Sequence, residues 1–248
     1  MNRSDVPTFD RIPLATLPRI VRTGWQLFLQ TRPLSVSFSM IFALIGIAVL
    51  ASITRAQYAP FAIPFAGAFM LIGPLLLAGF FSLADKINHG ETCSSSDIWH
   101  GFTGTPAGVW GIAAFCMLLF VVWMIDAAIL YGGMFGRAPQ PLLSLLEPNL
   151  SVLNYLLLSA LTGSVLAFLV FAVSAFSVPL LYYRRAALWP SIRLSIQAVF
   201  SNLPLCLIWS TFLAFAITAS VLIFPTFLVV FPVLAFASHA LYREIFPE

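Results

Sequence analysis

The histidine and cysteine side chains are the first candidates for chemistry, because imidazole and thiolate groups bind zinc and other soft metal ions. His89, Cys93 and His100 fall within one short polar stretch, where an acidic neighbour could add a further ligand. His239 lies far along the chain, but we expect it at the same depth of the fold. The spacing matches no zinc signature and contains no CxxC pair. The sequence therefore predicts no metal site, and these four residues are only weak candidates for one.

Asp126 is the one acidic residue inside a long apolar run. An acid within a membrane-spanning segment is costly and commonly marks a proton relay or a substrate path. Its position near the outer end of the run favours a structural role instead, as the partner of Arg137 in an ion pair. We keep Asp126 as a functional candidate and the pair as the preferred interpretation.

Arg22 and Arg193 are the remaining polar candidates, because each precedes an apolar run and could stand at the inner mouth of a path for an anion. The sequence contains no motif for nucleophilic catalysis or phosphate binding. The chain has no GxSxG nucleophile motif and no glycine loop followed by Lys-Ser. All histidines are expected near one surface, so they cannot face each other as haem ligands inside a bilayer. The sequence therefore predicts no catalytic residues and no cofactor.

Composition assigns the chain to the membrane class. Of its 248 residues, 60% are apolar and only 8% are charged, whereas about a quarter of the residues in a soluble domain are charged. The net charge of +3 would suit nucleic acid, but the basic residues lie between apolar runs, where membrane topology explains them. We therefore exclude nucleic acid and expect the lipid bilayer as the main partner.

Six apolar stretches are long enough to cross a hydrocarbon core about 30 Å thick, which needs about 20 helical residues. The predicted fold is all-α, with three helical hairpins in a single transmembrane domain over residues 19–248. Residues 1–18, which contain several prolines, are expected to form a flexible cytoplasmic tail. The predicted spans are residues 34–54, 59–84, 108–131, 152–183, 203–223 and 226–242, the last two separated by a turn at Phe224-Pro-Thr226.

Short amphipathic segments precede the first, third and fifth spans, and we expect them to lie in the membrane interface. Two of them show an apolar face at helical spacing. In the fourth run, small residues recur every four positions and predict the close approach of another helix. The first face comprises Ile20, Val21, Gly24, Trp25 and Phe28, the second comprises Leu188, Ile192, Ile196, Val199 and Phe200, and the small residues are Ser159, Gly163 and Ala167.

The basic residues predict the orientation. Of the 12 Lys and Arg residues, only Arg55 and Arg137 fall in segments that the six-span plan places outside. Inner loops of membrane proteins are rich in Lys and Arg. Both termini are therefore expected in the cytoplasm.

An internal repeat supports the hairpin plan. Three residues before the first span recur before the fifth at a single offset of 171 positions. Each set is followed by two apolar runs and a polar exit, residues 84–87 in one case and 241–244 in the other. The segment 98–106 resembles a degenerate middle copy. The matching pairs are Arg22 with Arg193, Gln26 with Gln197, and Pro33 with Pro204.

Four stretches resemble the DUF2189 family of bacterial integral membrane proteins. They are Val21-Arg-Thr-Gly-Trp25 with Pro33, Gly73 to Gly79, Trp123 to Tyr131, and Phe231 to Arg243. The resemblance extends over about residues 20–243. It implies a bacterial inner (cytoplasmic) membrane protein and no particular activity, because members are generally uncharacterised and some carry a cytochrome c oxidase label. The chain departs from the family near Ile125 and Asp126, where a basic residue is frequent, and at Ala237-Ser238, where Gly-His is frequent.

Three function classes remain open. The first is a non-catalytic accessory, scaffold or assembly partner of a larger inner-membrane complex, such as a respiratory one, or a homo-oligomer. The second is a transporter or channel for a small solute or anion, since proline-interrupted helices often surround substrate sites. The third is a membrane enzyme, which rests only on the His and Cys stretch. The scarcity of polar residues in the spans favours the first class.

Overall fold

The computed structural model describes residues 7–56, 77–136 and 149–247. These residues form helices and short links, without a β-strand among them, so the all-α prediction is confirmed. A further helical segment, 77–88, ends at Gly90, whose φ of 72° closes the helix with a left-handed turn. The other helices are η1 Leu14–Thr16, α1 Leu17–Gln30, α2 Arg32–Ala56, α4 Ser95–Thr103, α5 Ala107–Phe135, α6 Leu150–Ser174, α7 Ser177–Tyr182, α8 Leu188–Ser201, α9 Leu203–Leu222 and α10 Phe224–Ile245.

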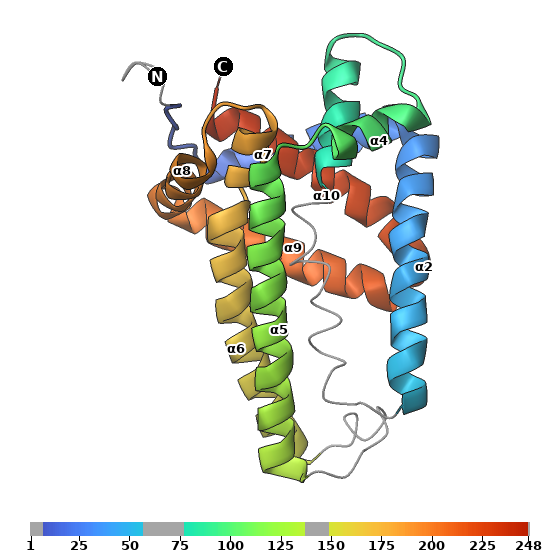
Figure 1. Ribbon diagram of the computed structural model, residues 1–248, viewed down its shortest axis with the longest axis vertical. Coiled ribbons are helices and arrows are strands. Elements are labelled where there is room, and N and C mark those ends of the chain that lie inside the picture. The colour runs from blue at the N-terminus through green and yellow to red at the C-terminus, as the bar shows by residue number, and fades with distance from the viewer. Residues whose placement is uncertain (1–6, 57–76, 137–148, 248) are drawn as a thin grey trace.

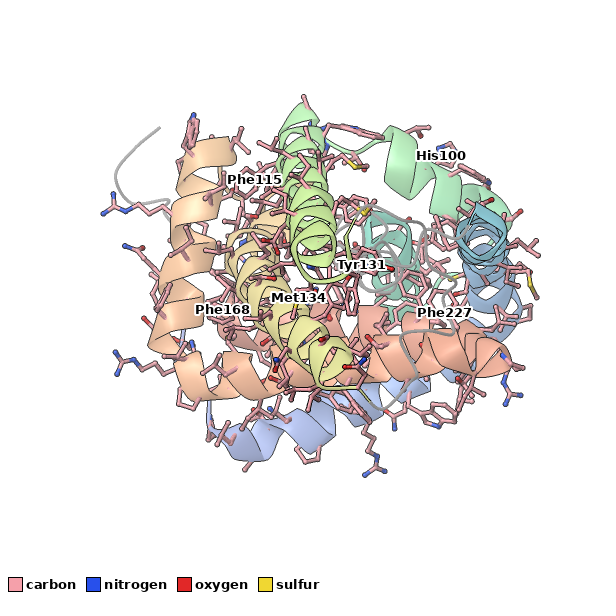
Figure 2. All side chains as sticks on the ribbon, turned by 90° about the horizontal axis from the view of Figure 1, so that it is seen from below. His100, Phe115, Tyr131, Met134, Phe168 and Phe227 are labelled. Atoms are coloured by element: carbon pink, nitrogen blue, oxygen red, sulfur yellow. The ribbon has the colours of Figure 1, made fainter. Side chains whose placement is uncertain are left out.

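The helices run in two main directions. Figure 1 shows α2, α5 and α6 along the long axis of the molecule, and α9 and α10 lying across it. The shorter helices α1, α4 and α8 gather toward the end that holds both chain termini (Figure 1). Figure 2 looks from the opposite end onto α5 and α6, which carry the labelled residues Tyr131 and Phe168.

Four helical stretches are long and apolar enough to cross a membrane, and they match the predicted third to sixth spans. α2 alone does not pass this test. It passes only when it is taken together with α1, and the two helices are bent by 98° relative to each other. The first predicted span is therefore a candidate only as part of this bent pair. The predicted span 59–84 lies mostly outside the described residues. The part of the chain that the structure describes thus contains four candidate spans, or five with the bent pair. The four are Ala107–Phe135, Leu150–Tyr182, Leu203–Ser220 and Pro225–Ile245.

One residue, Ile223, separates α9 from α10. Pro225 lies in the first turn of α10, where its missing N–H costs no helical hydrogen bond. The hydroxyl of Thr226 donates to the Ile223 carbonyl at 2.6 Å and supports the same turn. The predicted break at Phe224-Pro-Thr226 therefore exists, one residue earlier than expected.

α10 is the centre of the core and packs against α1, α2 and α9. It lies very close to Gly24 of α1, where an added Cβ would be 2.6 Å from the Val233 carbonyl oxygen and 2.8 Å from the Ala237 Cβ. Only glycine allows the two backbones to lie so close. The buried face of α1 includes Ile20, Gly24 and Phe28, as predicted, but it faces protein, and Trp25 is exposed.

α5 and α6 form a packed pair. The ring of Trp123 on α5 lies directly over Gly163 of α6, where a Cβ would come within 2.5 Å of the ring. Ser159 is fully buried in the same contact region. The stripe of small residues thus serves tight helix packing, as the sequence predicts.

α8 turns a different face to the protein than its apolar pattern predicts. The buried side includes the small residues Ser191, Ser195 and Ala198, whereas Phe200 is exposed. Of the other predicted face residues, Val199 is buried and Leu188, Ile192 and Ile196 are half-buried. The reason is the break between α6 and α7. There the Ser195 hydroxyl donates to the Ala172 carbonyl at 2.8 Å and accepts from the Phe176 N–H at 3.2 Å. Backbone groups freed inside a membrane protein need such partners.

The helix bounds agree with the internal repeat. α1 and α8 each have 14 residues, each is followed by a one-residue link, and each next helix has proline as its second residue. All these boundaries differ by the same offset of 171 that relates the repeated residues. The repeat found in the sequence therefore extends to the local structure of two helix pairs.

Residues 7–16, which the sequence predicts to be a flexible tail, make defined contacts with the end of the fold. The Asp10 N–H donates to the Ile245 carbonyl at 2.8 Å. The Asn202 side chain accepts from the Ile12 N–H at 3.0 Å and donates to the Asp10 carbonyl at 3.1 Å. The Phe9 and Phe246 rings lie 6.0 Å apart. These contacts hold the two ends of the chain together.

Candidate functional site

Three polar side chains from separate segments meet near the ends of α7 and α10. They are Asp85 of the helical segment 77–88, Tyr183 just after α7, and His239 of α10. The Tyr183 hydroxyl lies 2.9 and 3.0 Å from the two carboxylate oxygens of Asp85 and 2.8 Å from Nε2 of His239. Nε2 lies 3.8 Å from the nearer oxygen of Asp85. We call these residues the Asp85–Tyr183–His239 network.

The local backbone sets the position of Tyr183. The chain leaves α7 through a left-handed residue, Arg184, with φ 54°. The N–H of Arg184 bonds to the Leu181 carbonyl and that of Arg185 to the Leu180 carbonyl, both at 2.9 Å. This is the Schellman pattern that ends helices. It turns the chain so that Tyr183 and Arg185 both reach α10.

The hydrogen-bond directions in the network follow from an ionised Asp85. An ionised carboxylate can only accept hydrogen bonds, so the Tyr183 hydroxyl donates to Asp85. The same oxygen then accepts from Nε2–H of His239, which assigns the proton of a neutral imidazole to that nitrogen. Because His239 is only 1% exposed, an unpaired ring nitrogen here would be costly. The network therefore joins three segments and keeps Nε2 of the buried imidazole paired.

Aromatic rings and an arginine surround the network. The Tyr183 ring stacks on Tyr242 at 5.8 Å between centroids, with 7° between the planes, and the Phe81 ring lies 5.3 Å from that of His239. The Arg185 guanidinium donates to the Tyr242 hydroxyl at 3.2 Å and to the Phe246 carbonyl at 2.9 Å. A cation that bonds the last carbonyls of a helix complements its dipole. Arg185 thus fixes the end of α10 beside the network.

A second polar cluster anchors the start of α4. Oδ2 of Asp97 accepts from the Ser94 N–H at 2.7 Å and from the Ser94 hydroxyl at 2.9 Å. Its Oδ1 lies 3.0 Å from the Lys86 ammonium. The Ser94 backbone hydrogen bond, followed by that of Lys86, lowers the pKa of Asp97, and the bond to Asp97 raises the pKa of Lys86. The cluster ties α4 to the segment 77–88.

Acid is expected to release this anchor. Because folding lowers the pKa of Asp97 below its ordinary 3.8, its contribution to stability is complete above that value and is lost as the pH falls through the folded pKa. Hydrogen exchange at residues 94–97 should therefore show protection that is retained near neutral pH and lost in acid. In Asp97→Asn this protection should be weaker at neutral pH and change little with acid. Equal acid loss in both proteins would contradict the assignment.

The structure does not bring the four weak metal candidates together. His89 is exposed, with Nδ1 2.7 Å from the Asp85 carbonyl oxygen, and His100 lies exposed on α4 (Figure 2). Cys93 is half-buried, and burial raises the pKa of its thiol. His239 belongs to the network instead. Within the described ranges, no three His, Cys, Asp or Glu side chains are grouped to hold a metal ion.

Asp126 lies on α5 and is half-buried, and its Oδ2 has no hydrogen-bond partner among the described residues. The same holds for the buried polar atoms Trp123 Nε1, Tyr131 Oη and Ser159 Oγ of the α5–α6 pair. The predicted ion pair involves Arg137, which lies outside the described residues. Arg22 and Arg193 are both exposed, at matching positions of α1 and α8.

Sequence reasoning did not single out Asp85 or Tyr183. In the sequence, Asp85 is the first polar residue of the exit 84–87, and Tyr183 ends an apolar run. Tyr183 contacts both Asp85 and Tyr242, which hold the same place in the two exits 84–87 and 241–244. The pairing itself depends on how the segments pack, which periodicity does not specify.

Long apolar helices with exposed apolar flanks, joined at one end by a buried polar network, define an integral membrane protein of the all-helical class. Residues 62–182 match the family model described as predicted integral membrane protein (DUF2189). The resemblance seen in the sequence is thereby confirmed, over a stretch that includes two of its four motifs. No curated protein and no solved structure matches the chain.

Proposed function

We propose that the protein is a non-catalytic accessory, scaffold or assembly partner of a larger complex in the bacterial inner membrane. The observation that carries this proposal is the position of Asp126. Its carboxylate lies nine residues before the end of α5, about 14 Å along the helix. Its Oδ2 is already covered by the protein itself, so only the exposed part of this half-buried side chain can meet lipid or a partner. A lipid chain offers no hydrogen bond there, and an unpaired polar group in hydrocarbon costs on the order of several kcal/mol. A partner helix that supplies a donor would remove this cost.

The surroundings of Asp126 suit such a partner. Only 22% of the residues in the most apolar windows of α5 and α6 are buried, compared with 56% for α10. Large apolar side chains next to Asp126, including Ile125 and Ile129, are exposed. The α5–α6 pair therefore offers an apolar surface with one acid, a combination that an inter-subunit helix contact can use.

A mild-detergent pull-down from native membranes tests the proposal. Mass spectrometry should find other membrane subunits in stoichiometric amount, and haem bands that disappear on their removal would indicate a respiratory complex. Asp126→Leu should reduce the yield of these subunits about tenfold, a loss of about 1.4 kcal/mol. Ser164→Ala is the matched control, because Ser164 is exposed and bonds only the Ala160 carbonyl of its own helix. A lone, colourless protein would contradict the proposal.

An effect of Asp126→Leu has a second explanation, the predicted pair with Arg137. Arg137→Gln separates the two. If the contact with a partner matters, Arg137→Gln keeps the co-purifying subunits. If the intramolecular pair matters, both variants lose them to the same extent.

Transport of a small solute or anion is the second candidate function. Interrupted helices support transport, because they often surround substrate sites. α1 and α2 form a bent pair, two residues separate α6 from α7, and one residue separates α9 from α10. Anion flux into proteoliposomes that falls in Arg22→Gln and Arg193→Gln would support transport. Equal flux in protein-free vesicles would reject it.

We also propose the six-span, three-hairpin topology with both termini cytoplasmic. Its support is the contact between the chain ends, because termini on one side of a membrane require an even number of crossings. The crosswise direction of α9 and α10 relative to α2, α5 and α6 is the observation against it (Figure 1). The matched bounds of α1–α2 and α8–α9 support parallel repeat units. A cysteine placed at Gly136 should react with a membrane-impermeant maleimide from outside the cell. Reaction only in broken cells would contradict the topology.

A further inference from the structure

A depression of about 320 Å³ lies where α1 meets the last turns of α10. It borders the buried His239 but lies outside the hydrogen bonds of the network. Its polar lining consists of Arg19, Thr23, Asn88, His239, Arg243 and Glu244. Nothing in the proposed function uses this site.

Positive charge prevails in the depression. Arg19 contributes one guanidinium, which forms a 2.8 Å ion pair with Glu244 while its side chain remains 62% exposed. Arg243 contributes a second guanidinium, is exposed, and follows His239 by four residues on the same face of α10. Two arginines and one glutamate thus line the depression, which gives its lining residues a net positive charge. Guanidinium groups present paired donors that match phosphate oxygens.

The orientation of α1 indicates how deep in the membrane the depression lies. If α2 crosses the bilayer, the 98° bend places α1 along the membrane surface. The exposed Trp25 and Leu29 of α1 fit that position, because amphipathic aromatic and apolar residues anchor helices at the headgroup level. The depression then lies at the depth of lipid phosphates, on the side where the basic loops of the chain gather.

We propose that this depression binds a phosphate group, supplied by the headgroup of an anionic phospholipid. Arg19 and Arg243 bind the phosphate oxygens, and Glu244 competes with the phosphate for Arg19. Basic pockets at helix ends on the cytoplasmic side are suited to such headgroups. The site would couple the α1–α10 contact to the lipid surface.

Binding to the purified full-length protein in neutral detergent tests the proposal. The probes are a short-chain phosphatidylglycerol, a phosphatidylcholine of the same chain length, and inorganic phosphate, each titrated while intrinsic tryptophan fluorescence is recorded. Phosphatidylglycerol should bind the most tightly. Phosphatidylcholine binding equally well would overturn the proposal, and inorganic phosphate binding equally well would replace the lipid by a soluble anion.

Variants separate the site from general surface charge. Each of Arg19→Gln and Arg243→Gln should weaken phosphatidylglycerol binding about fivefold. Glu244→Gln removes the acid and should tighten binding, a gain that a misfolded variant would not show. Arg193→Gln is the matched control, an exposed arginine on α8 outside the depression. Equal affinities for all four variants and the wild-type protein would contradict the proposal.

Discussion

Tyr183→Phe should lower the free energy of unfolding by about 2–3 kcal/mol, because it removes a hydrogen bond to a carboxylate and leaves a buried imidazole N–H unpaired. The hydroxyl joins Asp85 to His239 at distances of 2.8 to 3.0 Å, and no other atom of Tyr183 can replace it. The measurement is the thermal or denaturant-induced unfolding of the purified protein in one detergent.

Tyr131→Phe is the matched control for this change. Its hydroxyl is also buried, but it has no hydrogen-bond partner within the described part of the chain. Its removal should therefore leave stability unchanged or raise it slightly. Combining Tyr183→Phe with Asp85→Asn should cost less than the sum of the two single changes, since both break one bond. Additive losses would show that the two side chains do not act together.

Gly24→Ala should destabilise the fold by about 2–3 kcal/mol, at the upper part of the usual range for overpacking. The new methyl group would lie 2.6 Å from the Val233 carbonyl oxygen, a backbone atom that cannot turn away. α1 would have to move off α10. Hydrogen exchange of α1, together with unfolding of the whole protein, measures both consequences.

Gly132→Ala provides the comparison, because a Cβ at Gly132 meets nothing within 4 Å. Glycine to alanine within an exposed helix usually stabilises it, by up to about 1 kcal/mol. The two identical substitutions should thus act in opposite directions. A neutral Gly24→Ala would mean that α1 does not pack on α10 as closely as the structure shows.

Residue periodicity and composition were sufficient for most of the helices. The apolar runs at 108–131, 152–183, 203–223 and 226–242 correspond to helices that can span a membrane. The small-residue stripe around Gly163 correctly predicted a close helix contact. These features depend on local sequence, namely run length, proline position and side-chain size, and therefore appear in the sequence directly.

Features that depend on packing between distant segments were not predictable in the same way. α8 buries the face around Ser195 because the α6–α7 break needs hydrogen-bond partners, whereas hydrophobicity alone selected a neighbouring face that shares Val199 with it. The Asp85–Tyr183–His239 network joins residues 56 to 98 positions apart within its hydrogen bonds. The crosswise direction of α9 and α10 likewise depends on tertiary contacts that a run of apolar residues does not encode (Figure 1).

The most direct test of the partner function is photocrosslinking in living cells from the exposed flank of α5. A photoreactive amino acid at Ile129, which is 67% exposed, would probe the surface beside Asp126. The same group at Trp189 of α8, 78% exposed, gives the comparison. The proposed function predicts a discrete protein adduct from position 129 that disappears in Asp126→Leu. Lipid adducts alone from position 129, with or without Asp126, would contradict it.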